Sequence, residues 1–358
     1  MCGRCQLKTE EHPPDAASGF TLLELLVVIA IMSATAWMAL SVVGDDAGQI
    51  RYEDTRNRLA AIREAVLGED AAEKRGILAG FVADNGRLPE SISELTSTPV
   101  GWDSFGADVA KKPIFDPTPD SEGYNNNDGD DVLLGAPRQQ LMKGHRGTYL
   151  RGRNAAGEYR DGWGIKITGG ASGKNCPAGP AGKGNDDDTK NYGWCVTQDD
   201  DGTELYVDSY GMNGTKNPDP PEENLYEYED DVSMSEPVLK SDWTTDIAGY
   251  SVKVDNRSSG DIVGELRVAL LVYDNKPSAT HGKWRQWISD SVSGCPDGDE
   301  IDIEFPDDEI PIPIGEHLLV LVRDDAPYQL PSGEYVTARV QFFPRYGVSK
   351  EKMKLVIR

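Results

Sequence analysis

Glu24 is the only charged residue in the 24-residue run from position 20 to position 43, FTLLELLVVIAIMSATAWMALSVV. As a helix, this run would be about 36 Å long, which is enough to cross the ~30 Å hydrocarbon core of a bilayer. A carboxylate in such a helix costs about 2.5 kcal/mol or more at the bilayer centre, so it needs a positively charged partner. The run therefore predicts a membrane-spanning helix with one carboxylate available for pairing.

The order of a small residue, Phe, Thr, two Leu and Glu before an unbroken apolar run resembles the N-terminus of type IV prepilins and type II secretion pseudopilins. The resemblance implies that prepilin peptidase cuts after Gly19 and methylates the new amine of Phe20. It also implies that Glu24 neutralises the Phe20 amine of a neighbouring subunit when helices bundle into a filament. Burying two opposite charges together is tolerable where burying either alone is not. A plain signal anchor with a stray glutamate is the alternative.

Three further motifs resemble the major pseudopilin of type II secretion. NGRLPESISEL at 85–95, RGTYL at 146–150 and DGWGIKI at 161–167 are similar to "NGxLP…L", "RGPYL" and "DPWGxxY". This chain has Thr148 and Gly162 where the family usually has Pro, and Ile167 where it often has an aromatic residue. A glycine beside a large ring permits a bend at a strand entry. Tyr149 and Trp163 are therefore expected in the core.

The acidic loops are candidates for cation binding. DSYGMNG at 208–214, followed by EDDV at 229–232, resembles the "SxGxDG…DDI" loop that holds calcium in major pseudopilins. The resemblance implies Asn213, Asp230 and Asp231 as calcium ligands, with Asn213 where the family has Asp. Calcium takes six to eight oxygen ligands. Asn213 still offers an oxygen but lacks the negative charge of an Asp, so calcium binding is expected to be weaker. A solvated acidic face is the alternative.

Of the five cysteines, Cys2 and Cys5 lie in the stretch that cleavage would remove. Cys176 and Cys195 are the expected disulfide if the chain matures in an oxidising compartment, and Cys295 is expected to be buried or free.

Composition and motifs argue against two other classes of function. A formal net charge of −25 argues against nucleic-acid binding through a broad basic surface, because the phosphate backbone would be repelled. The four histidines share no metal-binding spacing, and no glycine-rich phosphate loop follows a predicted strand. The chain is therefore not expected to be an enzyme.

The expected fold class is α+β. Residues 1–19 form a cleaved leader and 20–43 the transmembrane and assembly helix. Residues 44–235 form a pseudopilin-like head, in which the helix continues amphipathically to about Leu67 and packs on a small antiparallel sheet, as in the pilin fold. This head carries an inserted acidic loop at 116–131, and Gly44, Gly48 and Gly68 are expected to break or bend its helix.

After residue 235, seven short apolar runs separated by turn residues predict an all-β, immunoglobulin-like sandwich over 236–358. The runs are 249–254, 263–273, 284–288, 301–305, 316–322, 335–343 and 354–357. Such a domain is not part of the usual pseudopilin.

These features predict a structural subunit of a type II secretion pseudopilus or a related type IV filament. The alternative is a minor pilin or tip adhesin whose sandwich binds a surface or a partner protein. The expected partners are other pilin or pseudopilin subunits, prepilin peptidase and the inner-membrane assembly platform. Because Lys and Arg counts beside the helix do not decide orientation, the resemblance alone implies a single-pass inner-membrane protein with periplasmic C-terminal domains that later joins a filament.

Overall fold

The computed structural model describes residues 21–68, 80–107, 112–125, 130–135, 141–150, 159–164, 193–199, 201–211, 231–275, 283–342 and 353–358, with the backbone alone at 39–46. The chain divides into two compact units, residues 1–49 and 50–358. One long N-terminal helix precedes a β-rich C-terminal region, so the α+β class predicted from the sequence is confirmed.

Helix α1 runs from Leu22 to Leu67 without interruption. Gly44 and Gly48 were expected to break or bend the helix, and they do not break it, since a glycine inside a long helix costs only about 1 kcal/mol relative to alanine. The helix stops where predicted, at Gly68, whose φ is 92°, a left-handed conformation that glycine adopts without a Cβ penalty. Within the described residues, no helix is both long and apolar enough to span a membrane.

In the second unit, the C-terminal part of α1 buries Leu59, Ile62 and Val66, which lie three or four positions apart on one face. This face shares a core with a three-stranded antiparallel sheet. The strands of the sheet are β3 (Trp194–Gln198), β4 (Leu205–Ser209) and β5 (Val232–Ser233). Two short helices, α3 (Phe81–Asn85) and α4 (Ile92–Thr96), carry the first pseudopilin-like motif. Gly86 ends α3 with φ 78°, as the Asn-Gly pair predicts.

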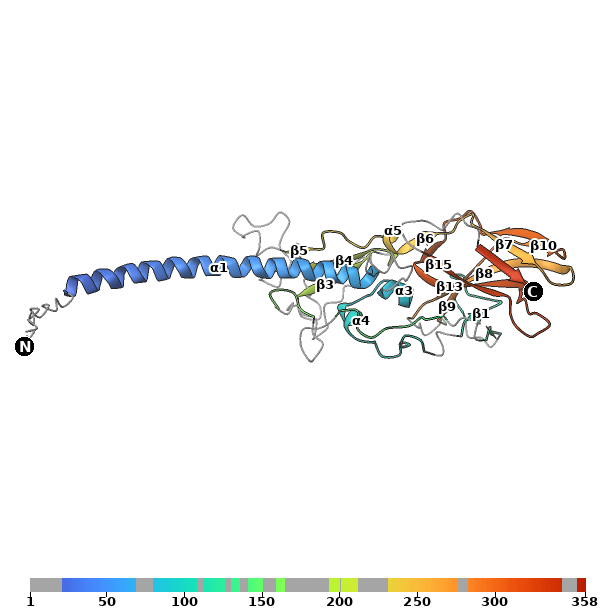
Figure 1. Ribbon diagram of the computed structural model, residues 1–358, viewed down its shortest axis with the longest axis horizontal. Helices are drawn as coiled ribbons and strands as arrows, with labels where there is room; N and C mark the ends of the chain where they lie inside the picture. Colours follow the sequence, from blue (N-terminus) through green and yellow to red (C-terminus); the bar gives the residue numbers. More distant parts are fainter. Residues whose placement is uncertain are drawn as a thin grey trace, which may run out of the picture. The chain divides into compact units, whose positions relative to one another are not determined.

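A six-stranded and a three-stranded sheet follow in the C-terminal region, where Figure 1 labels β7, β8, β9, β10, β13 and β15. The first contains β8 (Ile262–Tyr273), β9 (Trp284–Ile288), β10 (Val292–Cys295), β13 (Gly315–Arg323), β14 (Ala326–Pro327) and β15 (Thr337–Phe342). The second contains β7 (Ser251–Asn256), β11 (Glu300–Glu304) and β16 (Met353–Ile357), with β16 parallel to β7. Apolar side chains of both sheets form one core. Each of the seven predicted runs contains a strand. The strands of 2 to 4 residues at 244–246, 292–295, 311–313 and 326–327 were not predicted, because runs this short give no clear apolar pattern.

The acidic loop 116–131 is bounded by a small hairpin of β1 (Ile114–Phe115) and β2 (Val132–Leu133). Its first half lies along β9, where the N–H of Gln286 donates to the Gly123 carbonyl at 2.8 Å and that of Asn125 to the Trp284 carbonyl at 3.1 Å. The backbone of this half is therefore hydrogen-bonded to a strand of the C-terminal region.

The head also shares its core with residues beyond 235. Helix α5 (Lys240–Trp243) precedes β6 (Thr244–Asp246), which pairs with β12 (Pro311–Pro313). Val238, Trp243 and Ile314 belong to the same apolar cluster as α1 and β3. The head and the first part of the C-terminal region are therefore packed together in the second unit.

Candidate functional site

The predicted assembly residue Glu24 lies in the first turn of α1. Its carboxylate accepts hydrogen bonds from the N–H of Thr21 at 2.9 Å and from the Thr21 hydroxyl at 3.0 Å, and the Glu24 N–H donates back to that hydroxyl at 3.3 Å. Thr21 and Glu24 thus form a capping box, which satisfies backbone donors that a helix start leaves unpaired. Thr21 was not among the predicted site residues, although its T-x-x-E spacing with Glu24 is a sequence signal of this motif.

The described side chains of α1 between 22 and 38 are all exposed, including Leu22 at 81 % and Trp37 at 79 %. An apolar surface of this extent is stable only when lipid or protein covers it. Gly19 and Phe20, the predicted processing residues, lie outside the described residues.

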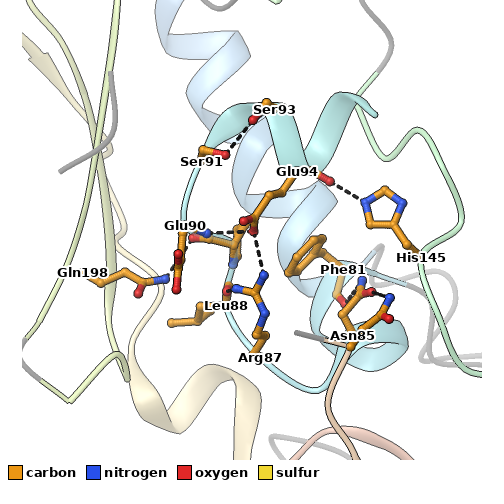
Figure 2. A network of polar contacts seen from close by, with 12 residues as sticks. Phe81, Asn85, Arg87, Leu88, Glu90, Ser91, Ser93, Glu94, His145 and Gln198 are labelled. Carbon is orange, nitrogen blue, oxygen red and sulfur yellow. Dashed lines mark hydrogen bonds and ion pairs between the residues drawn. The ribbon is translucent and has the colours of Figure 1, made fainter. Parts of the chain in front are cut away.

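The NGRLP motif forms a closely bonded loop (Figure 2). The Glu94 carboxylate accepts hydrogen bonds from Arg87 at 3.1 Å and from the Glu90 N–H at 2.9 Å. On the other side, the Gln198 amide of β3 donates to the Pro89 carbonyl at 2.9 Å. The motif therefore connects α4 with the head sheet.

The glycine of the same motif lies against the C-terminal region. A Cβ at Gly86 would be 2.1 Å from the Tyr273 carbonyl oxygen at the end of β8. Next to it, the Asn275 amide donates to the Asn85 side-chain oxygen at 2.8 Å. The Asn-Gly pair thus serves both as a helix cap and as a contact between the head and β8.

A buried carboxylate joins the first two pseudopilin-like motifs. Asp84 is 2 % exposed and accepts hydrogen bonds from Arg146 at 3.1 Å and from the Tyr149 hydroxyl at 2.9 Å. Burial raises the pKa of the Asp84 carboxyl, and the guanidinium of Arg146 opposes that rise. Tyr149, predicted as a core residue, is partly buried against the head core and also serves as a hydrogen-bond donor.

Lys143 is a fully buried cation at the contact between α3 and β13. Its ammonium donates to the Ala83 carbonyl at 2.7 Å, and a Cβ at Gly315 would be 2.8 Å from the same nitrogen. Burial lowers the pKa of Lys143 to about 8, while Asp84 and Glu316 act in the opposite direction.

This depressed pKa predicts an alkaline gain in stability. Between pH 8 and 10 this lysine, which titrates near 10.5 in the unfolded chain, binds more protons there than in the folded chain. The contribution of Lys143 to the free energy of unfolding should therefore rise with pH, by about 1.4 kcal/mol per unit at most, whereas the raised pKa values of Tyr149 and Tyr273 act in the opposite direction. In urea unfolding at pH 7.5, 8.5 and 9.5, Lys143→Met should lack this rise relative to the wild type, and the exposed Lys112→Met should follow the wild type. A rise of equal size in Lys143→Met would contradict the assignment.

The DGWG motif fixes the C-terminal part of α1 to the head sheet. The Asp161 carboxylate accepts hydrogen bonds from the Ser209 hydroxyl at 2.7 Å and from the Gly164 N–H at 2.6 Å. The Gly162 N–H donates to the Thr55 hydroxyl of α1 at 2.8 Å. Trp163, predicted as a core residue, is partly buried against the head core.

The calcium and disulfide predictions fall mostly outside the described residues, as Asn213, Asp230 and Cys176 do. Asp231 directly precedes β5, and among the described side chains no group of three or more His, Cys, Asp or Glu is placed to hold a metal ion. Cys195 is disulfide-bonded, and its pairing with Cys176 stays a prediction. Cys295 is buried and free.

A family model of the prokaryotic N-terminal methylation motif matches residues 15–40. By its N-terminus, the chain is type IV pilin-like. The matched segment contains Gly19, Phe20 and Glu24, and the motif indicates processing by prepilin peptidase and assembly with other pilin subunits. Proteins of this type are structural rather than enzymatic, and their precursors are membrane-anchored. Comparisons of this pilin-like chain with curated proteins and with solved structures give no match.

Proposed function

We propose that the chain is a structural subunit of a type II secretion pseudopilus or a related type IV filament. Its precursor is a single-pass inner-membrane protein anchored by residues 20–43, with the rest of the chain periplasmic. The methylation motif at 15–40 carries the proposal. It is supported by the start of α1 at Leu22, which leaves Glu24 in the first helical turn. The contact of α1 with the β3–β4–β5 sheet supports a pilin-type head.

The charge at Glu24 supports assembly through a neighbouring subunit. Among the described residues, its carboxylate makes hydrogen bonds to Thr21 and no ion pair. A carboxylate moved from water into an apolar helix bundle needs a cation, because its desolvation is otherwise uncompensated. The free amine of Phe20 of another subunit supplies this charge on the same apolar surface.

Processing is tested at the cleavage site. Gly19→Phe should leave the full-length precursor in the membrane, because the peptidase requires a small residue before the cut, whereas Gly19→Ala should still be processed. Intact-mass and N-terminal analysis of the wild-type protein should find a methylated Phe20 as the first residue. A mature N-terminus at another position would refute the assignment.

Assembly is tested by separating the charge of Glu24 from its capping role. Glu24→Gln can keep the hydrogen bonds to Thr21 but loses the charge, and Thr21→Val loses the capping hydroxyl but keeps the charge. We expect the peptidase to process both variants. Glu24→Gln should be strongly depleted from sheared filaments. Thr21→Val should be incorporated almost normally, since the loss of a helix cap costs only about 1 kcal/mol. Wild-type incorporation of Glu24→Gln would count against charge pairing.

The C-terminal region favours a second candidate function, that of a minor pilin or tip adhesin. Its two sheets share one apolar core, which supports an immunoglobulin-like sandwich able to contact a surface or a partner protein. The copy number in purified filaments separates the candidates, because a repeated subunit must accommodate this region in every copy.

We also propose for the head a calcium ion held by Asn213, Asp230 and Asp231, and a disulfide between Cys176 and Cys195.

A further inference from the structure

A cleft of about 380 Å³ opens in the second unit between the NGRLP loop and the C-terminal region. Sites of roughly 300–1,000 Å³ take small ligands or a few side chains of a partner, and they often lie where two parts of a chain meet. Residues far apart in the sequence form its walls, among them Leu88, Trp243, Trp287 and Pro313. These side chains give the cleft apolar and aromatic walls.

Hydrogen bonds hold the walls in place. The indole N–H of Trp243 donates to the Thr203 carbonyl at 2.7 Å, and Gln198 donates to the Pro89 carbonyl at 2.9 Å (Figure 2). The Arg285 side chain of β9 donates to the Glu122 carbonyl at 2.7 Å. A cleft fixed in this way loses little conformational freedom when a ligand enters.

Some of the charged side chains that line the cleft are already paired within the chain, and others are not. Arg87 is paired with Glu94 at 3.1 Å, and Lys240 is paired with Glu309. Arg285 lies over the Trp287 ring, 4.6 Å from its centroid, and makes no ion pair within the described ranges. The carboxylates of the exposed residues Glu122 and Asp201 likewise make no hydrogen bond or ion pair there. Two unpaired carboxylates and one unpaired guanidinium leave an excess of negative charge for a ligand at this rim.

We propose that this cleft binds a Lys or Arg side chain on an extended segment of a partner protein. The aliphatic stem of such a side chain packs along apolar walls while its cation stays at the polar rim. Glu122 and Asp201 supply the opposite charge there, and the net charge of −25 attracts a basic partner from a distance. Binding is a property of the single chain and does not depend on filament assembly.

The experiment is calorimetric titration of the full chain in detergent with Gly-Gly-Lys-Gly-Gly, Gly-Gly-Arg-Gly-Gly, Gly-Gly-Glu-Gly-Gly, free lysine and maltotriose. We expect saturable, salt-sensitive binding of the two basic peptides and none of the acidic peptide or the sugar. Glu122→Gln with Asp201→Asn should weaken binding of the basic peptides about five- to tenfold, as expected for the loss of two partly exposed ion pairs.

Glu304→Gln with Asp297→Asn is the matched control, because it removes the same charge from exposed residues that do not line the cleft and should leave the affinity unchanged. Equal weakening in both double variants would show non-specific attraction and overturn the proposal. The absence of saturable binding of the basic peptides would also overturn the proposal. If free lysine bound as tightly as the peptides, the ligand would not be a segment of a protein. If maltotriose bound and the basic peptides did not, the cleft would be a sugar site and the proposal would be wrong.

Discussion

A chain truncated after residue 235 is expected to lose the folded head together with the C-terminal strands. The truncation removes Val238, Trp243 and Ile314, which are at most 7 % exposed and lie in the core that α1 and β3 share. Burying each such side chain contributes roughly 1.5–3 kcal/mol, so the sum approaches the roughly 5–15 kcal/mol by which a whole domain is stable. The truncation also removes the two backbone hydrogen bonds between Val238 and Leu205.

Limited proteolysis and near-ultraviolet circular dichroism of the truncated chain measure this loss. In the full chain, Ile314→Ala should lower the free energy of unfolding by about 2–5 kcal/mol, because it leaves a cavity in the core. Val263→Ala is the matched control, since Val263 is 78 % exposed and its trimming should cost less than about 0.5 kcal/mol. A truncated head with protease resistance and aromatic signals equal to those of the full chain would show that it folds independently.

Elements with local signals could be predicted from the sequence. The seven C-terminal runs either alternate apolar and polar residues or are continuously apolar, and turn residues separate them, so each strand is specified by its own neighbours. The end of α1 at Gly68 and the cap at Gly86 follow from the same local chemistry. In the first turn of α1, the charge of Glu24 indicates a need for a partner, and the spacing of Glu24 from Thr21 is the local signal for the capping box that forms there.

The contacts between segments could not be predicted in this way. Asp84 and Arg146 are 62 positions apart, and nothing in either motif indicates that they meet. Lys143 looks like an ordinary surface lysine in the sequence, because lysine is rarely fully buried, yet the structure encloses it between α3 and β13. The packing of Val238, Trp243 and Ile314 into the head core likewise depends on tertiary contacts that the patterns of apolar and polar residues do not encode.

Gly162→Pro, which restores the residue usual in the pseudopilin motif, is expected to destabilise this chain. The Gly162 N–H donates to Thr55 at 2.8 Å, and proline has no N–H. A Cβ at position 162 would also lie 2.1 Å from the Arg51 carbonyl oxygen, so α1 would have to move. The lost hydrogen bond costs about 1 kcal/mol and the overpacking about 1–3 kcal/mol, which gives a loss of about 2–4 kcal/mol in the free energy of unfolding.

Denaturant unfolding of the full chain at neutral pH tests this expectation. Gly162→Ala keeps the N–H and meets only the steric contact, so its loss should be smaller than that of Gly162→Pro. Gly164→Ala is the matched control in the same motif. Gly164 has φ 67° and its nearest atom to an added Cβ is 3.8 Å away, so backbone strain alone should cost about 1 kcal/mol. If Gly162→Pro were as stable as the wild type, the loop would not lie against α1 as closely as the hydrogen bond to Thr55 requires.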